Sequence, residues 1–500
     1  MSEPQESDQI VQRRANLEEL RTLGIDVYPR RFDSEATVES LVQAFGERTG
    51  EELEATQPTS RTCGRILTIR SFGKANFLVL SDGKTRIQVY VRKDSMPEQD
   101  FRIFSLLDFG DWVGVSGRLF RTKTNELTIW ASSLTFLSKC LLPLPEKFHG
   151  LQDVEIRYRQ RYLDLIVSPE SRRVFEIRSR VVTAIREFLT TRGFLEVETP
   201  MMQPMAGGAL ARPFVTHHNA LDLQLYMRIA PELYLKRLTV GGIEKVFEIN
   251  RNFRNEGIST QHNPEFTMLE FYWAYADYEA LMALTEELLP EVARKATGGD
   301  EVVFGAHTIS LKPPFRRLSL REGARAAAEA KLGEPITPEV MRDREAVAAI
   351  ARRLHLEVTP TMGAGKITSE IFEALCEDDL IQPTFVYDFP TEVSPLSKQR
   401  ADDPDTVERF EMYVAGFELA NAFSELNDPV EQRRRFEDQL RGRAGGDDEA
   451  HQMDEDYIRA LEYGMPPAGG EGLGIDRLVM LLTGSQSIRD VILFPLMRPR

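Results

Sequence analysis

The feature that most constrains this fold is an apolar stretch with a glutamate in its middle, FTMLEFY at residues 266–272. Side chains of a strand alternate between its two faces, and one face here carries Phe266, Met268, Glu270 and Tyr272. The other face, with Thr, Leu and Phe, is also mostly apolar, so we expect the strand to lie deep in a core. Burying a carboxylate is costly unless a cation or several donors meet it. The fold must therefore bring a positive group to Glu270.

The sequence before this strand predicts its partner. Residues 245–257, KVFEINRNFRNEG, alternate like a second strand, and the long segment ISTQHNPE that follows indicates the loop of an antiparallel hairpin. The hairpin is expected to place Arg254 and Glu256 near the base of the loop, close to Phe266, with His262 in the loop itself. A guanidinium, a carboxylate and an aromatic ring can hold a phosphate, an exocyclic amine and a purine face. The alternative is an Arg–Glu salt bridge beside a core phenylalanine.

A second predicted hairpin carries a pair of glutamates. In ERFEMYVAGFELANAFSELND, residues 408–428, the dipeptide Ala-Gly at 415–416 is a turn signal, and folding about it is expected to place Glu411 opposite Glu418. Like charges directly across a hairpin are unfavourable unless a cation lies between them. Oxygen ligands without a nearby His or Cys favour Mg²⁺ over zinc. The alternative is that both glutamates are solvated, and the metal interpretation gains weight only beside the arginines.

A glycine-rich strand precedes the last long helix. GEGLGIDRLVMLL, residues 470–482, has glycine at every second position before the helix. Glycines in a strand allow a ligand or another backbone to approach closely, and Arg477 is expected to project from the first turn of the helix. This pattern is compatible with a polyphosphate. It is not a Walker loop, because GxxxxGK[ST] is absent, and the dinucleotide fingerprint in its usual setting is absent too.

Length and charge set the broad class. A chain of 500 residues, 42% hydrophobic and 28% charged, is expected to be a globular protein of two or three domains. A formal net charge of −16 argues against a protein that coats nucleic acid electrostatically. Basic segments at 61–92, 157–162 and 171–180 still leave open an enzyme that grips RNA, although each is equally compatible with a solvated helix face.

Cysteine usage and hydropathy bear on the compartment. The three cysteines, Cys63, Cys140 and Cys376, are widely scattered with no CxxC pair, which excludes a disulfide framework or a zinc cluster and suits the cytoplasm. No apolar run approaches the length of a membrane span, and the polar start MSEPQESDQ is unlike a signal peptide. We therefore expect a cytoplasmic protein with no membrane partner.

Composition and hydrophobic patterning divide the chain into four predicted parts. Residues 1–58 are predicted to be a charged helical arm, and 59–142 contain five short strands with Gly-bearing turns, typical of an OB-type β-barrel that reads single-stranded nucleic acid. A purely structural β-domain is the alternative for that part. A Pro-rich linker is expected at 143–165, followed by a large α+β region at 166–500 with a helical insertion at about 316–380.

Three motifs, in order, resemble the signatures of class II aminoacyl-tRNA synthetases: GFLEVETP, FRNEG with HNPEFTMLEFY, and GxGxGxDR. With an OB-type domain in front, the chain resembles the group specific for Asp, Asn and Lys. The segments ARPFVTHHNALD, RIAPELYLKRL, NAFSELND and IRDVILFP are similar to the bacterial-type lysyl-tRNA synthetases, and the resemblance runs from about residue 61 to 498. It implies a catalytic domain built on an antiparallel sheet flanked by helices.

The resemblance implies roles in binding ATP. Arg254 and Arg477 would be the catalytic residues, Arg254 holding the α-phosphate and the substrate carboxylate and Arg477 the γ-phosphate. Glu256 would read the adenine amino group while Phe266 stacks on the ring. The nucleotide-covering loop would contribute His262 and Asn263.

It likewise implies a lysine site and a metal site. Gly208 and Glu232 would receive the α-amino group and Asn421 the carboxylate. The side-chain ammonium of lysine would be the cation that meets Glu270, together with Tyr272 and Glu425. An aspartate-specific site would need a cation here, and the pocket positions are expected to offer none. Mg²⁺ on the polyphosphate would be carried by Glu411 and Glu418.

The implied reaction joins lysine to the 3′ end of tRNA(Lys) through lysyl-adenylate, with pyrophosphate released, and needs no protein nucleophile. The enzyme then supplies alignment and charge neutralisation. In the barrel, Phe77 is expected to stack on an anticodon base while Gln88 and Arg65 read base edges. The resemblance also implies a homodimer formed through the first motif.

Some residues depart from the family pattern, and two rival functions remain. Ala420 and Ala422 stand where glycines are expected and would tighten the pocket, and Glu471 replaces an apolar residue, which puts ATP affinity in doubt unless its side chain points away. One rival is a paralogue that attaches lysine to a protein, but such paralogues lack the OB domain. The other is a non-enzymatic RNA-binding protein, which predicts loss of Arg254, Arg477 or the glutamate pair.

Overall fold

The computed structural model describes the chain except residues 1–6, 74, 146–152, 210, 445–452 and 500. The described residues divide into two compact units, one within residues 1–172 and one within residues 173–500.

The first unit begins with the predicted helical arm. Its helices are α1 (Asp8–Thr22), α2 (Val38–Phe45) and α3 (Gly50–Thr56). The last of these starts with a capping box, in which Thr49 and Glu52 each satisfy the other's backbone N–H group. Leu17 and Leu20 of α1 are buried in one cluster with the residues inside the barrel, so the arm packs on the barrel core.

The predicted OB-type barrel is confirmed. Its strands are β1 (Thr59–Phe72), β2 (Ala75–Ser81), β3 (Arg86–Val91), β4 (Trp112–Arg121) and β5 (Leu127–Ser138). They close in the order β1-β2-β3-β5-β4, with η1 (Lys93–Ser95) and α4 (Glu98–Ser105) between β3 and β4. Alternate side chains of β2 and β3 are buried, as a strand with one face in a barrel core requires.

The predicted linker at 143–165 is only partly described, because residues 146–152 lie outside the described residues. Beyond that gap it is helical, with α5 (Val154–Arg159) and the start of α6 (Arg161–Val167).

The second unit is built on one eight-stranded sheet, as the α+β prediction required. The strand order is β14-β15-β16-β17-β18-β11-β10-β6. These strands are β6 (Leu195–Glu196), β10 (Lys245–Phe253), β11 (Glu265–Ala274), β14 (Arg316–Ser319), β15 (Thr384–Tyr387), β16 (Arg409–Val414), β17 (Phe417–Ser424) and β18 (Ala468–Gly474). All neighbours are antiparallel except β14 with β15 and β10 with β6.

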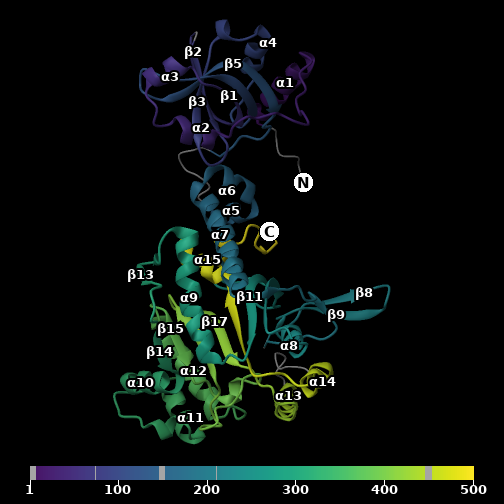
Figure 1. The fold of residues 1–500 in the computed structure, drawn as a ribbon, viewed down its shortest axis with the longest axis vertical. Coiled ribbons are helices and arrows are strands. Elements are labelled where there is room, and N and C mark those ends of the chain that lie inside the picture. Colours follow the sequence, from purple (N-terminus) through teal and green to yellow (C-terminus); the bar gives the residue numbers. More distant parts are fainter. Residues whose placement is uncertain (1–6, 74, 146–152, 210, 445–452, 500) are drawn as a thin grey trace. The chain divides into compact units, whose positions relative to one another are not determined.

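One face of this sheet is covered by helices. The helices α7 (Pro169–Thr191), α9 (Tyr278–Thr297) and α15 (Ile475–Thr483) contribute to the largest buried cluster, and Figure 1 shows α9 running along the sheet. From β11 this cluster takes Leu269 and Phe271. Glu270 and Tyr272 therefore belong to the opposite face, as the alternation of a strand predicts.

The predicted insertion is helical, with its own hydrophobic core. It contains α10 (Leu320–Leu332), η2 (Pro338–Met341), α11 (Arg344–Arg353), α12 (Ala364–Cys376) and η3 (Glu377–Asp379). The helices begin four residues later than predicted, because residues 316–319 form β14 at the edge of the main sheet.

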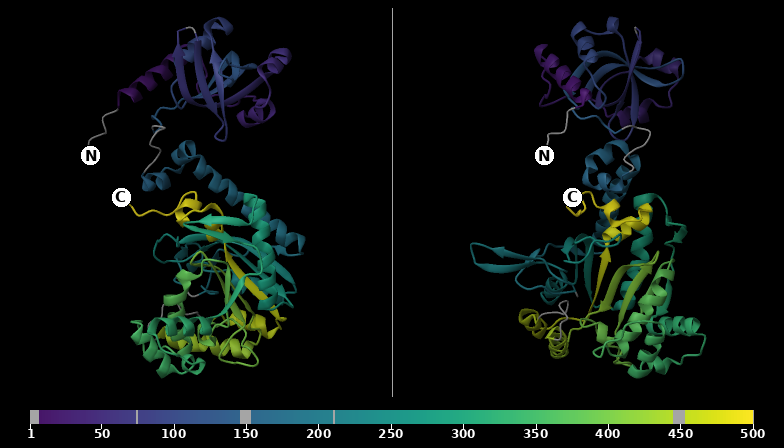
Figure 2. Two further views of the ribbon diagram at one scale, coloured as in Figure 1. Left: turned by 90° about the vertical axis from the view of Figure 1, so that its left-hand side faces the viewer. Right: turned by 180° about the vertical axis from the view of Figure 1, so that it is seen from behind.

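Smaller elements surround the sheet. They are the strands β7 (Met202–Gln203), β8 (Val215–His218), β9 (Leu223–Met227), β12 (Glu301–Phe304) and β13 (His307–Ser310), and the helices α8 (Glu232–Val240), η4 (Thr391–Val393), α13 (Pro429–Ala444), α14 (Glu455–Glu462) and α16 (Ile488–Val491). Figure 2 shows the hairpin of β8 and β9 extending away from the main sheet. In the described part of the chain no helix is both long and apolar enough to span a membrane.

Candidate active site

A cavity of about 410 Å³ lies on the face of the sheet opposite α9. Its walls are formed by β11, β16, β17 and β18, the loop between β10 and β11, and the start of α8. The cavity brings together the predicted catalytic-domain residues with one exception, Glu425. They are Gly208, Glu232, Arg254, Glu256, His262, Asn263, Phe266, Glu270, Tyr272, Glu411, Glu418, Asn421 and Arg477.

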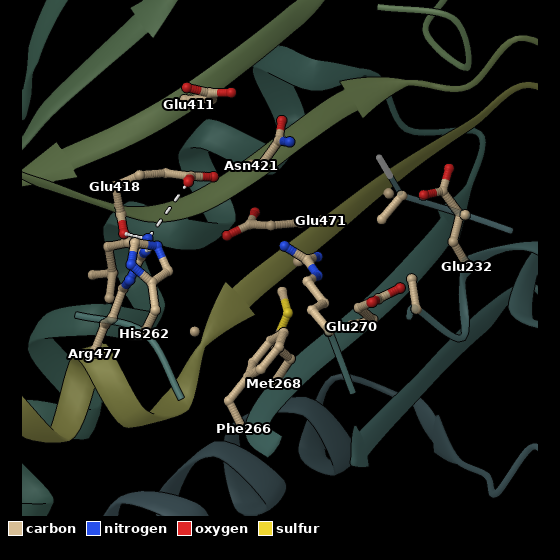
Figure 3. Close-up of a pocket in the computed structure, with 18 of the residues that line it drawn as sticks. Glu232, His262, Phe266, Met268, Glu270, Glu411, Glu418, Asn421, Glu471 and Arg477 are labelled. Atoms are coloured by element: carbon tan, nitrogen blue, oxygen red, sulfur yellow. Dashed lines mark hydrogen bonds and ion pairs between the residues drawn. The ribbon is translucent and has the colours of Figure 1, made fainter. Parts of the chain in front are cut away.

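Figure 3 shows how these side chains are distributed. Glu411, Glu418 and Asn421 project from β16 and β17, and Arg477 lies beside His262. Glu232 and Glu270 lie at the other end of the view. The labelled arginine thus lies at the end with Glu418, away from Glu232 and Glu270.

The first hairpin is confirmed. β10 pairs with β11 in an antiparallel register that sets Asn252 opposite Phe266. The Arg254 guanidinium lies above the Phe266 ring, with Cζ 5.1 Å from the ring centroid. Among the described residues Arg254 forms no ion pair with Glu256, and its Nε has no hydrogen-bond partner. The alternative of a closed salt bridge beside a core phenylalanine is therefore not the arrangement observed.

The loop between these strands is tied to the last helix. Arg477 Nη2 lies 3.3 Å from His262 Nε2, and Ser259 Oγ lies 3.0 Å from His262 Nδ1. Burial, reinforced by the Arg477 charge, lowers the pKa of His262, so the ring is neutral and can accept from Arg477. Asn263 is buried and donates to the Glu265 carbonyl at 2.5 Å.

The register of the second hairpin differs from the prediction. Ala415 and Gly416 form the turn with φ of 57° and 76°, the left-handed values of a two-residue type I′ turn. This turn pairs Tyr413 with Glu418. Glu411 is therefore not opposite Glu418, and the predicted direct pairing was wrong because it miscounted the residues of the turn.

A β-bulge then shifts the remaining register, so that Glu411 lies opposite Asn421. The extra residue, Leu419, is buried. Because a bulge adds one residue to one strand, Glu418 and Asn421 both face the pocket although they are three residues apart. Glu411 and Glu418 thus share a wall of the pocket without being direct partners.

Glu411 has close partners that the sequence reasoning missed. Arg409 Nη2 donates to its Oε1 at 2.5 Å, and the Tyr413 hydroxyl lies 2.6 Å from its Oε2. Burial raises the pKa of Glu411 to about 7, an effect that Arg409 opposes and Glu418 reinforces. The signal was available, since Arg409, Glu411 and Tyr413 alternate on one strand.

A preassembled metal cage of three or more His, Cys, Asp or Glu ligands does not occur among the described residues. Two carboxylates on one wall nevertheless suit Mg²⁺, which keeps several waters and is held by one or two carboxylates together with substrate phosphates. The oxygen-only chemistry of Glu411 and Glu418 therefore fits this ion.

Glu270 is buried at the other end of the pocket. It is 5% exposed, and the Tyr272 hydroxyl lies 3.5 Å from its Oε2. Burial raises the pKa of Glu270 to about 8, with Glu232 adding to the rise and Arg254 opposing it. Within the described residues Glu270 forms no ion pair. The sequence predicted that this buried carboxylate requires a cation, and in the structure its side chain is open to one from the pocket.

Glu425 is placed differently from the expectation. It is 1% exposed and lies behind the pocket wall, where Lys236 Nζ is 2.5 Å from its Oε2. Lys236, also fully buried, is 2.6 Å from Glu232 Oε1. The sequence reasoning missed this cation: α8 brings Lys236 between the two glutamates, although Lys236 does not line the cavity.

The protonation of this triad follows from its geometry. Burial would lower the pKa of Lys236, but Glu232 and Glu425 raise it above its ordinary value. Burial also raises the pKa of Glu425, which Lys236 opposes. We take Glu425 as ionised, because an ammonium at 2.5 Å stabilises the carboxylate. The spacing of Glu232 and Lys236, four residues apart on a helix, was the available signal.

Two glycines are required by this packing. Gly208 has φ of 90°, and a Cβ there would come within 3.1 Å of the Glu232 Cβ. At Gly470 a Cβ would lie 2.4 Å from the Tyr272 ring and 2.3 Å from Glu425 Oε1. The glycine-rich strand thus lets side chains of the pocket approach its backbone closely.

The residues that depart from the family pattern face away from the pocket. Ala420 and Ala422 are buried in the core on the helix side of the sheet, so the expectation that their methyls tighten the pocket was wrong. Glu471 borders the pocket, but its carboxylate lies 2.7 Å from Thr285 Oγ1 of α9. Burial raises the pKa of Glu471 to about 8. The side chain points away, which is the condition under which ATP affinity was expected to survive.

The three predicted anticodon contacts are not all together in the barrel. Phe77 on β2 packs against Tyr90 on β3, with 5.1 Å between the ring centroids. Gln88 lies on the same face of β3 as Tyr90 and accepts a hydrogen bond from the Thr128 hydroxyl at 3.0 Å. Arg65 instead donates to the Gly110 carbonyl at 2.9 Å and lies over the Trp112 ring. Phe77 and Gln88 stay candidates for base contacts, whereas the Arg65 side chain is bound to Gly110 and Trp112 of the barrel.

Comparison with known proteins finds two matching family models. The model described as tRNA synthetases class II (D, K and N) matches residues 153–498. An OB-fold nucleic acid binding domain matches residues 61–137, the barrel described above.

Full-length relatives are also similar to this chain. A protein of Carboxydothermus hydrogenoformans named Lysine--tRNA ligase is 54% identical over 499 residues, which is 100% of both chains. A protein of the same name from Syntrophomonas wolfei is 53% identical over 97% of this chain and 96% of its own length. Another from Bacillus cereus is 51% identical over 100% of this chain and 99% of its own.

Proposed function

Because the chain belongs to the class II tRNA synthetases of the D, K and N group, we propose that it is a lysine–tRNA ligase. It activates lysine with ATP to lysyl-adenylate and pyrophosphate and transfers the lysyl group to the 3′ end of tRNA(Lys). The relatives that share its full length carry the name Lysine--tRNA ligase. The observation that carries the choice of amino acid is Glu270, a buried carboxylate that opens on the pocket without an ion-pair partner among the described residues.

Charge balance supports a substrate with two ammonium groups. Glu232, Glu270 and Glu425 supply three carboxylates, and among the described residues only Lys236 forms ion pairs with them, to Glu232 and Glu425, while Glu270 has none. Lysine brings an α-ammonium and a side-chain ammonium. In the proposed pose Gly208 and Glu232 receive the first, and Glu270 with Tyr272 receives the second.

The same charge balance argues against aspartate and asparagine, the other amino acids of this family's group, as substrates. Aspartate would add a negative charge beside Glu270 and be repelled. Asparagine would leave the buried carboxylate without a cation, and a site that rejects a substrate in this way discriminates strongly. Glu425 acts on the pocket through Lys236 rather than by direct contact.

ATP fits the other end of the pocket. Phe266 offers its ring to the adenine and Glu256 accepts from the adenine amino group. Arg254 contacts the α-phosphate and the lysine carboxylate, and Arg477, beside His262, clasps the γ-phosphate. The pocket needs no protein nucleophile, because the lysine carboxylate itself attacks the α-phosphorus and the chain supplies alignment and charge.

Glu411 and Glu418 would hold Mg²⁺ beside the polyphosphate. When bound, the ion neutralises charge on the phosphate oxygens. In this proposal Arg409 balances the buried Glu411 charge, which keeps the carboxylate ionised for its role as a ligand.

The barrel serves the tRNA. Phe77 provides a stacking surface and Gln88 a base-edge contact for the anticodon; Arg65 contributes through the packing of Trp112. We also propose a homodimer, supported by large apolar side chains exposed near the first motif, among them Leu195, Met201 and Met202. The cytoplasmic location inferred from the scattered cysteines stays a prediction.

The test is ATP–pyrophosphate exchange with Mg²⁺, with each of the twenty amino acids offered separately. We expect exchange with lysine, followed by charging of tRNA(Lys). Lysine-dependent exchange without tRNA charging would favour a paralogue that modifies a protein. A folded protein without any exchange would favour the non-enzymatic RNA-binding function, and exchange with aspartate or asparagine would refute the assignment of Glu270.

A further inference from the structure

Arg409 lies on the pocket wall and bonds to several neighbours. The predicted reaction assigns it no contact with substrate. It lies on β16 two residues before Glu411 and lines the cavity. Its guanidinium donates to Val393 O at 3.0 Å and Ser394 Oγ at 2.9 Å through Nη1, and to Glu411 through Nη2. The Phe389 ring covers it, with Cζ 4.4 Å from the centroid. The guanidinium is therefore fixed in position by four neighbours.

A further donor of Arg409, its Nε–H, fixes a side chain of the substrate pocket. Nε lies 3.0 Å from Oδ1 of Asn421 on the neighbouring strand. A guanidinium nitrogen only donates hydrogen bonds, so the amide atom that faces it must be the oxygen. The amide nitrogen of Asn421, with its two hydrogens, must then point the other way. Within the described parts of the chain that nitrogen donates to no protein acceptor, although Asn421 lines the cavity.

The orientation of this amide decides what it can recognise. An Asn421 that presents its nitrogen is a donor and attracts a carboxylate, whereas the flipped amide would present an oxygen and repel one. A free asparagine can adopt either orientation at little cost. The bond from Arg409 removes that freedom, because the flipped amide would set its NH₂ group against the Nε–H.

We propose that Arg409 is a positioning residue for amino-acid recognition: it locks the Asn421 amide so that its nitrogen faces the α-carboxylate of the substrate. The inference rests on the proposed function and deepens it. Arg409 itself does not touch the substrate in this account. Its effect reaches the ligand only through Asn421 and concerns the carboxylate alone.

A merely structural role for Arg409 makes a different prediction. Its bonds to Val393, Ser394 and Glu411 also hold the pocket wall together, and losing them would weaken every ligand alike. The two roles are separated by comparing lysine with lysinol, in which a hydroxymethyl group replaces the carboxylate. Lysinol keeps both ammonium groups and serves as an internal control for the integrity of the pocket.

The experiment is calorimetric binding of lysine and of lysinol to the full-length protein and to Arg409→Met, Asn421→Ala and the double variant. In Arg409→Met we expect the Kd for lysine to rise about tenfold, the usual size of a lost charge-assisted hydrogen bond, and the Kd for lysinol to change less than twofold. Asn421→Ala should behave alike. In the double variant, Arg409→Met should add nothing to the effect of Asn421→Ala, since residues that act through one contact are not additive.

Other results overturn the inference. Equal loss of lysine and lysinol binding in Arg409→Met would show a structural role, and multiplied effects in the double variant would show that Arg409 acts directly on the carboxylate by its charge. Arg400→Met is the matched control, because Arg400 pairs with Asp388 and Asp402 and does not line the pocket; it should bind both ligands normally. If the unaltered protein binds lysinol and lysine equally poorly, the proposed function fails and the inference fails with it.

Discussion

Two buried glutamates on neighbouring strands have similarly raised pKa values, but they face opposite sides of the sheet. Glu270 on β11 and Glu471 on β18 lie next to each other in the sheet, Glu270 opposite Gly472 and Glu471 opposite Phe271. Burial raises the pKa of each to about 8. Glu270 faces the pocket and forms no ion pair with any described residue, whereas Glu471 faces α9 and meets Thr285.

The helix-side glutamate can bond to Thr285 as a neutral acid. Thr285 Oγ1 lies 2.9 Å from the Leu281 carbonyl and 2.7 Å from Glu471 Oε2, but a hydroxyl has one hydrogen to donate. If Thr285 donates to Leu281, a protonated Glu471 can donate to Thr285, and both bonds are made. A raised pKa therefore does not identify a site by itself. Access to a ligand distinguishes Glu270 from Glu471.

The largest effect expected from this comparison is that of Glu270→Gln. Removing the charge that meets the side-chain ammonium should lower kcat/KM for lysine in ATP–pyrophosphate exchange by about 10³-fold. The paired variant Glu471→Gln should change it by less than about twofold, since its carboxylate does not face the pocket. Comparable losses in the two variants would mean that buried charge in the sheet, and not contact with lysine, controls activity.

A third buried glutamate extends the comparison, because Glu425 already has its cation. Lys236→Met leaves Glu425 and Glu232 without their ammonium, and breaking a buried ion pair on one side costs about 3–5 kcal/mol. We expect a correspondingly lower free energy of unfolding in urea. Adding Glu425→Gln should recover part of the loss. A single variant as stable as the unaltered protein would contradict the ion pairs described here.

A variant in the barrel separates recognition of tRNA from activation of lysine. Phe77→Ala removes a stacking surface, and stacking of a base on an aromatic ring is worth about 1–3 kcal/mol. The KM for tRNA(Lys) in charging should rise about tenfold while lysine-dependent exchange is unchanged. Phe136, which is buried inside the barrel, offers a contrast, since Phe136→Ala should lower stability. An unchanged KM for tRNA in Phe77→Ala would place the anticodon elsewhere.

The stability contributed by Glu471 is expected to change with pH. Its pKa is raised in the folded state from 4.5 to about 8, so folding favours the protonated form. The resulting stability is complete below pH 4.5 and is lost as pH rises from 4.5 through 8. Glu471→Gln, which cannot ionise, should therefore match the unaltered protein below pH 4.5 and exceed it in unfolding free energy by up to about 4 kcal/mol at pH 8, the size of the full pKa shift. Thermal unfolding at several pH values measures the difference. A difference that does not change with pH would show that the pKa of Glu471 is the same in the folded and unfolded states.

Much of the fold and of the pocket could be predicted from local patterns. The strand of Glu270, its hairpin partner and the turn at Ala415 and Gly416 are confirmed, because alternation and left-handed turn residues are properties of short segments. The register beyond that turn could not be predicted, since the β-bulge at Leu419 depends on how the strand packs against its neighbours.

What the sequence by itself determined is which residue types stand on which strand and helix: an acid in an apolar strand, arginines beside it, glycines in the strand that follows. The tertiary structure alone decided which of these charges meet. It set Lys236 of α8 between Glu232 and Glu425, turned Glu471 toward Thr285, and left Glu270 open to the pocket. The physical reason is that the free energy of a buried charge depends on the groups within a few ångströms of it, and those groups come from distant parts of the chain.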